Sequence, residues 1–143
     1  MISLRITNLY EYTNSVKTKK DLIYAEECYK IIGIIFGVFN EVGYGYKESF
    51  YQKAIAKAFK ENGIDFKEQL RANVKFRNED LGLLVLDFLV FDKIVVELKQ
   101  KNYFSQRDIS QLYSYLKATD LKLGLLVYFT KSGVRYKRIV NLR

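Results

Sequence analysis

The sequence contains no histidine and only one cysteine, Cys28, and these scarcities exclude several kinds of functional site. Without histidine the chain has no Ser-His-Asp or Cys-His catalysis, no histidine-ligated zinc ion and no histidine general base. One cysteine supports neither a disulfide framework nor a cysteine-cluster zinc site. Any acid–base or metal chemistry must therefore use carboxylate, lysine and tyrosine side chains.

Long apolar segments and low-complexity linkers are also missing. The polar residues 1–20 lack the apolar core of a signal peptide, so we expect a loosely ordered arm in a cytoplasmic protein. The apolar run over 31–39 is well short of the ~20 residues that span a bilayer, which predicts a buried helix and no membrane partner. Of the 143 residues, 49% are hydrophobic, and we expect 21–143 to form one domain with its own core.

The order of the predicted elements favours an α/β fold. Helical spacing of apolar residues predicts helices over 22–42, 47–61 and 107–117. Apolar, β-branched runs predict strands over 66–76, 83–91, 94–99 and 121–129, with an edge strand over 136–140. The 121–129 strand should run parallel to the 94–99 strand, because a helical crossover separates them. We therefore expect a mixed sheet covered by helices on both faces.

Three ionisable residues interrupt the most apolar pair of strands. Asp87, Glu97 and Lys99 lie within runs that otherwise belong in a core. Burying such groups costs several kcal/mol each unless a metal ion or an opposite charge compensates them. Two carboxylates and a lysine on adjacent strands can together hold a hard divalent cation and face a phosphate. This constellation is typical of a metal-dependent nuclease.

The loop between these strands decides whether the three side chains meet. A two-residue turn at 92–93 would place Asp87 and Glu97 on opposite faces of the sheet. A three-residue loop over 91–93, or a bulge, would place Asp87 beside Glu97 with Lys99 on the same face. The nuclease hypothesis requires the three-residue loop or the bulge. The alternative is a structural salt bridge between Asp87 and Lys99.

Further candidates are one acid near the start of a helix and a group of late basic residues. Glu48 lies in a first helical turn, one turn before Tyr51, where the helix dipole stabilises any carboxylate, so an ordinary solvated acid is the alternative. The formal net charge is +8, and nearly all of the excess of basic over acidic residues lies after Lys99. Its simplest interpretation is a solvated basic face, but beside a metal site it becomes a phosphate track. The candidates for this track are Arg107, Lys131, Arg135 and Arg138, and we also expect Tyr51 to contact nucleic acid.

Four motifs occur in an order that resembles the GxxExxY proteins of the PD-(D/E)xK nuclease superfamily. The segment 45–51, Gly-Tyr-Lys-Glu-Ser-Phe-Tyr, matches GxxExxY, and Asp87 matches the first acid of the core. The segment 97–99 matches ExK, and 111–115 matches QxxxY. The resemblance extends from about Leu22 to Asn141, and it is specific because of the order and spacing of the motifs.

This resemblance implies a restriction-endonuclease-like core with three layers and a metal site, with one or two metal ions left open. Asp87 and Glu97 would ligate magnesium, Glu48 would complete the site, and Lys99 would steady the attacking water or the scissile phosphate. Gln111 and Tyr115 of the QxxxY motif would contact DNA or support the site. Gln111 would also be catalytic.

Two departures from the family pattern concern the first helices. Gly37 and Phe39 stand where many members carry a glutamate and a histidine, and Tyr44 replaces a proline in the Gly-x-Gly turn. The missing glutamate weakens the case for a second metal site, whereas the central acids and lysine are intact.

The sequence thus predicts metal-dependent hydrolysis of phosphodiester bonds in nucleic acid, which we expect to be DNA, without strong sequence specificity. Mg²⁺ would be the cofactor, and Mn²⁺ could substitute. One alternative is a catalytically silent module of the same fold that binds nucleic acid or assembles with protein. Another is a small partner protein that docks through a tyrosine-rich surface. A homodimer is left open.

Overall fold

The computed structural model describes residues 23–142, and the predicted arm over 1–20 lies outside them. The helices of this part are α2 (Ala25–Val42), α3 (Glu48–Glu61) and α4 (Gln106–Thr119). The strands are β1 (Phe66–Phe76), β2 (Glu79–Val90), β3 (Ile94–Lys99), β4 (Leu123–Thr130) and β5 (Gly133–Val140). None of the helices in this part of the chain has the length and apolar character needed to cross a membrane.

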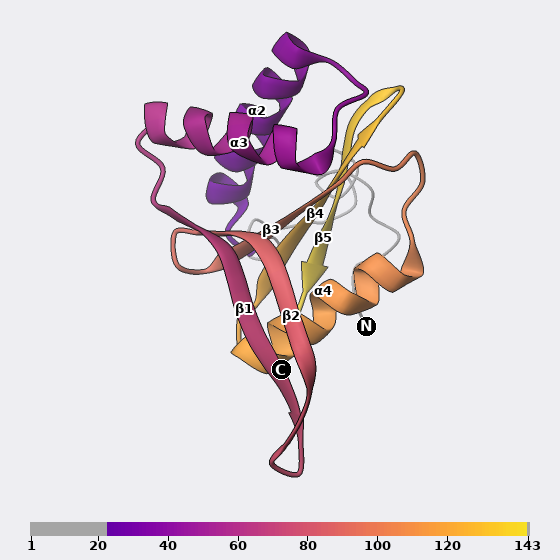
Figure 1. Cartoon of the computed structure of the whole chain (residues 1–143). Helices are drawn as coiled ribbons and strands as arrows, with labels where there is room; N and C mark the ends of the chain where they lie inside the picture. The colour runs from indigo at the N-terminus through magenta and orange to yellow at the C-terminus, as the bar shows by residue number, and fades with distance from the viewer. Residues whose placement is uncertain (1–22, 143) are drawn as a thin grey trace, which may run out of the picture.

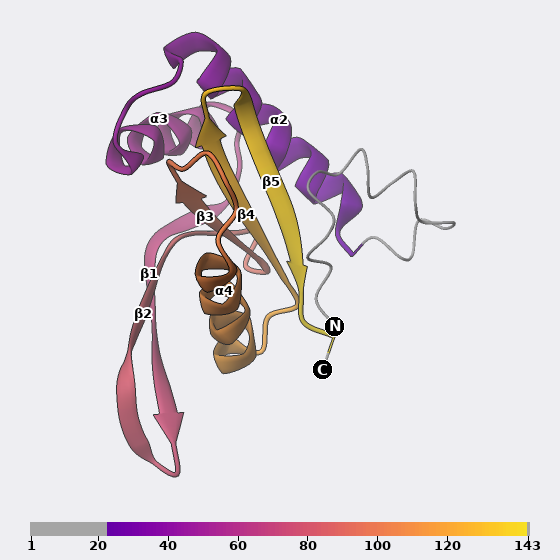
Figure 2. The same cartoon turned by 90° about the vertical axis from the view of Figure 1, so that its right-hand side faces the viewer.

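The five strands form one mixed sheet in the order β1-β2-β3-β4-β5. β3 and β4 run parallel, whereas the other neighbouring strands are antiparallel. α4 makes the crossover between the parallel pair, and every residue of β4 is buried, as is typical of a central parallel strand. α2 and α3 cover one face of the sheet and α4 the other (Figures 1 and 2). The predicted three-layer α/β fold is therefore confirmed.

Each face of the sheet has its own apolar core, because residues of a strand alternate between the two faces. Ile94, Val96 and Leu98 of β3 pack with the buried sides of α2 and α3. Val95 belongs to the other core, beneath α4, where it packs with residues such as Leu112. By the same alternation, the positions of Glu97 and Lys99 belong to the α4 face.

The β2–β3 hairpin turns through the three-residue loop 91–93. Its first two residues adopt left-handed conformations, with φ of 56° and 57°. Phe88 and Val96 form the last pair of this ladder, and the next residues, Asp87 and Glu97, are joined by a hydrogen bond from the amide of Asp87 to Oε1 of Glu97. The alternative with a three-residue loop is thus confirmed, and both acids lie on one face of the sheet.

The β1–β2 hairpin is longer than predicted and projects from the rest of the molecule (Figure 1). β2 begins at Glu79, four residues before the predicted start, and it pairs there with Phe76. The two residues between them, Arg77 and Asn78, both have positive φ, of 49° and 68°. This conformation matches the twist of antiparallel strands, so a two-residue turn closes the hairpin without glycine.

α4 packs closely on β4 at Gly124. A Cβ atom at this position would lie 2.9 Å from side-chain carbons of Leu112. The close packing of α4 on the sheet therefore leaves no room for a side chain at this position unless Leu112 moves.

Candidate active site

The acidic pair is held by hydrogen bonds between β2 and β3. The backbone amide of Asp87 donates to Oε1 of Glu97 over 3.2 Å. The amide of Leu98 donates to Oδ2 of Asp87 over 2.7 Å. Glu97 is buried and Asp87 is half-buried. Each carboxylate thus accepts a main-chain hydrogen bond from the opposite strand, which fixes the two groups side by side.

This proximity shifts the protonation of both groups. Burial raises the pKa of Glu97 to about 8, and the neighbouring charge of Asp87 adds to the effect. Burial also raises the pKa of Asp87, against the opposing effect of the hydrogen bond from Leu98. Two buried carboxylates in contact cannot both carry a full negative charge without compensation. The pair therefore favours either a retained proton or a bound cation.

Lys99 supplies part of that compensation. Its Nζ atom lies 3.4 Å from Oε2 of Glu97 and 4.0 Å from Oδ1 of Asp108. Burial alone would lower the pKa of Lys99, but the attraction of Glu97, Asp108 and Glu48 outweighs burial and raises the pKa. The ammonium group is thus kept charged between two acids.

Asp108 is a member of this cluster that the sequence did not reveal. Its Oδ2 atom accepts a hydrogen bond from the hydroxyl of Tyr128 and another, over 2.8 Å, from Nζ of Lys101. Burial alone would raise the pKa of Asp108, but the bonds from Lys101 and Tyr128 outweigh it, and the pKa is lowered. Its amide also donates to Oγ of Ser105, the N-cap of α4. The Ser-x-x-Asp spacing is a helix-start signal, and it carries no information about Lys99.

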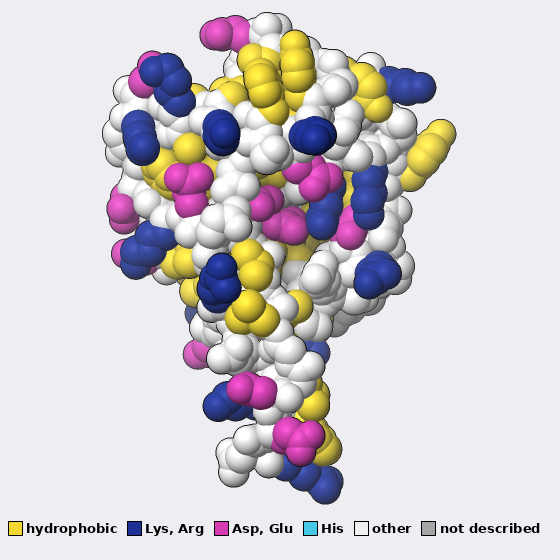
Figure 3. All heavy atoms as spheres, viewed as in Figure 1, with side chains coloured by type: hydrophobic (Ala, Val, Ile, Leu, Met, Phe, Trp, Pro, Cys, Tyr) yellow, Lys and Arg dark blue, Asp and Glu magenta, His cyan; other side chains and the backbone are white. Residues whose placement is uncertain are grey.

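Glu48 reaches the same cluster from the first turn of α3. Its Oε2 atom accepts a hydrogen bond of 2.9 Å from the backbone amide of Gln100, directly after β3. Its charge also contributes to the raised pKa values of Asp87 and Lys99. Acidic and basic side chains gather at the centre of the face shown in Figure 3.

The donor set of the acidic pair fits a hard divalent cation. Mg²⁺ uses one or two carboxylates, keeps several waters and takes substrate oxygens as further ligands, which Asp87 and Glu97 can satisfy. Within residues 23–142, no group of three or more acidic or thiol side chains is close enough to hold a metal ion. A site that also includes Glu48 therefore stays a prediction, and the Asp87–Glu97 pair is its preformed part.

Tyr51 was predicted to contact nucleic acid, but its side chain lies in the core. Its ring stacks on Phe129 with centroids 4.1 Å apart, and its exposure is 0%. Its hydroxyl donates to the carbonyl of Gly43 over 2.6 Å. This bond ties the start of α3 to the end of α2, so we assign Tyr51 a structural role close to Glu48.

Two other predicted contact residues are also buried. Tyr115 lies in the core beneath α4, where burial raises the pKa of its hydroxyl. Arg138 is fully buried and donates to the carbonyl of Ile23. These placements correct the predicted contacts of Tyr115 and Arg138 with nucleic acid. The remaining predicted residues have exposed side chains, namely Arg107, Gln111, Lys131 and Arg135.

Comparison with known proteins gives one family match. A family model described as the PD-(D/E)XK nuclease superfamily matches residues 25–139. No curated protein matches the chain at a significant level. Among solved structures, SSO0001 has 16% sequence identity and a TM-score of 0.49, over 92% of this chain and 72% of that one. An alkaline exonuclease from Laribacter hongkongensis has 15% identity and a TM-score of 0.49, over 87% and 72% of the two chains.

Proposed function

Because the chain belongs to the PD-(D/E)XK nuclease superfamily, we propose that it is a metal-dependent nuclease that hydrolyses phosphodiester bonds in DNA. The observation that carries the proposal is the pairing of Asp87 with Glu97 on one face of the sheet, with Lys99 3.4 Å from Glu97. A structural salt bridge needs one acid and one base. A second buried acid in contact with the first needs either a retained proton or a cation, and a cation gives the pair a chemical use.

In this proposal each side chain has a separate task. Asp87 and Glu97 hold the cation, and Glu48 faces it from α3. A bound Mg²⁺ or Mn²⁺ supplies a water of lowered pKa and positive charge next to the phosphate. Lys99, a compact charge on a flexible stem, orients the attacking water or the phosphate. Asp108 holds Lys99 on the side away from Glu97, and Gln111 supports the site from the exposed side of α4.

The basic residues supply attraction for the substrate without reading its sequence. Arg107, Lys131 and Arg135 are exposed and carry charges that can neutralise backbone phosphates. Phosphate contacts position a nucleic acid and carry no sequence information directly. We therefore propose cleavage without strong sequence specificity.

Cleavage of labelled linear DNA, circular DNA and RNA, with and without Mg²⁺ or Mn²⁺, tests the function. The wild type should cut at least one of these substrates only when the metal is present. Asp87→Asn should remove the activity, whereas Asp92→Asn should retain it, because Asp92 is an exposed acid in the loop of the same hairpin. Lys99→Ala should also be inactive, with Lys60→Ala as its matched control on the exposed side of α3.

The controls decide between the proposal and its alternative. Cleavage that persists in Asp87→Asn would assign the activity to another site or to a contaminant. Metal-independent binding of nucleic acid without any cleavage would support the catalytically silent module. Cleavage of circular DNA would identify an endonuclease.

A further inference from the structure

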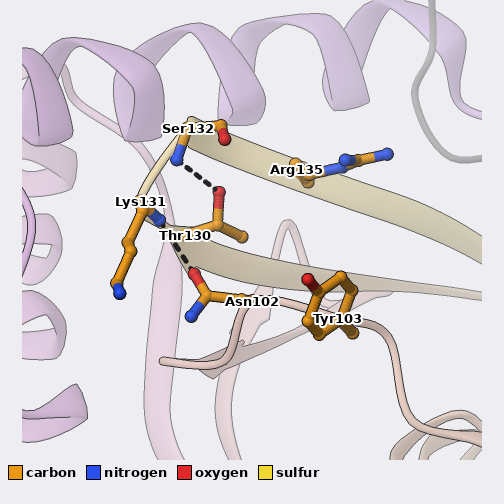
Figure 4. Close-up of a pocket in the computed structure, with 6 residues that line it drawn as sticks. All are labelled: Asn102, Tyr103, Thr130, Lys131, Ser132 and Arg135. Carbon is orange, nitrogen blue, oxygen red and sulfur yellow. Dashed lines mark hydrogen bonds between the residues drawn. The ribbon is translucent and has the colours of Figure 1, made fainter.

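A pocket of about 280 Å³ lies where the β4–β5 hairpin meets the segment between β3 and α4 (Figure 4). The residues that line it are polar, aromatic or cationic, and none is acidic. They are Asn102, Tyr103, Thr130, Lys131, Ser132 and Arg135. A concave site with two cations and no carboxylate has the composition of an anion-binding site.

Hydrogen bonds hold the backbone around this pocket in one conformation. Oγ1 of Thr130 donates to the carbonyl of Gly133 over 2.7 Å and accepts from the amide of Ser132 over 3.1 Å. The amide of Lys131 donates to Oδ1 of Asn102 over 3.0 Å. The bond from Lys131 to Asn102 joins the hairpin to the segment after β3, so the pocket has a preformed wall on both sides.

Four donor groups remain available around that wall. Lys131 and Arg135 are exposed, and neither forms an ion pair within residues 23–142. In the same range, the hydroxyl of Ser132 and the amide nitrogen of Asn102 have no hydrogen-bond acceptor among the described side chains and carbonyls. Figure 4 shows Lys131 and Arg135 at opposite ends of the pocket, with their side chains extending away from each other. A phosphate group can accept hydrogen bonds from several such donors at once.

Tyr103 adds a second kind of contact. Its side chain is 86% exposed, more than that of any other large hydrophobic residue among those described. Proteins that bind single-stranded nucleic acid combine a cationic groove with aromatic rings on which bases stack. The six residues that line the pocket include both features, the two cations and the exposed aromatic ring.

The position of the pocket relative to the acidic cluster gives it a place on the substrate path. β3 and β4 are parallel, so their carboxyl ends lie at one edge of the sheet, the usual location of ligand sites in such sheets. Lys99 pairs with Tyr128. Thr130 follows two residues later, about 7 Å further along β4 at the ordinary rise of a strand.

We infer that this pocket is a subsite for an unpaired nucleotide of the substrate, next to the bond that is cut. Lys131 and Arg135 bind the phosphates on its two sides, and Tyr103 stacks on its base. The inference rests on the proposed function, which brings a nucleic-acid backbone to Lys99. It adds a substrate class, namely single-stranded DNA or the unpaired end of a duplex.

Binding of short labelled oligonucleotides to Asp87→Asn in the presence of EDTA tests the subsite without cleavage. The probes are a single-stranded thymidine hexamer and a hexamer of abasic sites with the same number of phosphates. Tyr103→Ala should weaken binding of the thymidine hexamer about tenfold, as expected for one stacked base, and should leave the abasic probe unaffected. Removing both Lys131 and Arg135 as alanines should weaken binding of both probes.

Two control variants separate the pocket from general charge and from the hydroxyl of Tyr103. Tyr103→Phe keeps the ring and should bind like the parent. Lys122→Ala removes an exposed lysine that precedes β4, at the opposite end of the strand from Lys131, and should have little effect on either probe. Equal affinity of Tyr103→Ala and the parent for the thymidine hexamer would overturn the subsite.

Cleavage assays distinguish a failure of the subsite from a failure of the proposed function. With Asp87 intact, Tyr103→Ala should lower kcat/KM about tenfold more for single-stranded DNA than for a blunt duplex. Activity that depends on Asp87 but shows the same substrate ratio in Tyr103→Ala would reject the subsite and keep the nuclease. Binding that depends on Tyr103, without metal-dependent cleavage by the wild type, would reject the nuclease and support the pocket as a binding site for an unpaired nucleotide.

Discussion

The backbone amide of Asp87 donates a hydrogen bond of 3.2 Å to Oε1 of Glu97, so the main chain of the hairpin holds the two acids together. The carboxyl groups therefore cannot separate freely when they ionise. Without a cation, the repulsion between them must appear as a loss of folding free energy. With a cation bound, the same repulsion becomes part of the driving force for binding it.

This relationship predicts how stability depends on pH in the metal-free protein. The pKa of Glu97 rises from its ordinary value of 4.5 to about 8 on folding. Between these values the folded state holds more protons than the unfolded state, so the contribution of Glu97 to the free energy of unfolding decreases as pH rises. Melting temperatures in EDTA should show this decrease in the wild type relative to Glu97→Gln. Asp92→Asn should follow the wild type, and a smaller loss with rising pH in the wild type than in Glu97→Gln would contradict the assignment.

Lys99 should matter more for turnover than for folding when metal is present. Lys99→Ala should lower cleavage by on the order of 10²–10³-fold, as does the loss of one stabilising donor in other active sites. Its melting temperature in Mg²⁺ should stay close to that of the wild type, because the ion compensates the acids. A large destabilisation that added Mg²⁺ does not relieve would show that Lys99 has a purely structural role.

The exposed basic residues should determine how strongly salt weakens binding. Each phosphate contact releases a counterion, so replacing Arg107, Lys131 or Arg135 by alanine should reduce the slope of log K against log salt by about one. Arg138→Met should leave this slope unchanged and lower the melting temperature, because the Arg138 side chain is buried. Binding that does not respond to salt would contradict a phosphate track.

Asp108 should stabilise the fold through the hydroxyl of Tyr128. Asp108→Ala leaves this buried hydroxyl and the amine of Lys101 without their acceptor, which should cost roughly 1–3 kcal/mol in urea unfolding. Tyr128→Phe also removes two hydrogen bonds, the one to Asp108 and the one that the hydroxyl accepts from the backbone amide of Ser105 over 3.1 Å, so its cost should be similar. In a double-mutant cycle the two changes should be less than additive, and full additivity would show that the contact contributes nothing.

The space around two glycines predicts opposite effects on stability when each is replaced by alanine. Gly124→Ala would bring a Cβ within 2.9 Å of Leu112 and should destabilise the protein by roughly 1–3 kcal/mol. Gly33 lies on the exposed side of α2 with nothing within 4 Å of the position of a Cβ. Gly33→Ala should therefore stabilise the protein by roughly 0.5–1 kcal/mol in thermal unfolding.

The candidate site was predictable where ionisable residues contradict an apolar pattern. Asp87 and Glu97 are visible in the sequence because they interrupt buried strands, and the hairpin that joins them is local. For the β2–β3 hairpin, the sequence left two registers open, one with a two-residue turn and one with a three-residue loop. The choice depends on left-handed conformations at residues 91 and 92, which a phenylalanine and an aspartate do not signal as glycine would.

The residues that were missed or misplaced depend on contacts between distant segments. Nothing near Asp108 in the sequence indicates that Tyr128 donates to it from β4. The placement of Arg138 had a usable signal, since alternation puts it on the same face of β5 as Tyr136 and Val140, which are apolar. Arginine is rarely buried without a partner, so the residue type favoured a surface position where the strand pattern favours burial.

The hydrogen bonds of the acidic cluster also differ in how far they reach along the chain. The bond between Asp87 and Glu97 joins residues 10 apart, whereas the bond from Gln100 to Glu48 joins residues 52 apart. Hairpins close within microseconds, and contacts between distant segments form more slowly because more chain entropy is lost. A refolding molecule should therefore assemble the Asp87–Glu97 pair first and acquire Glu48 only when α3 docks on the sheet.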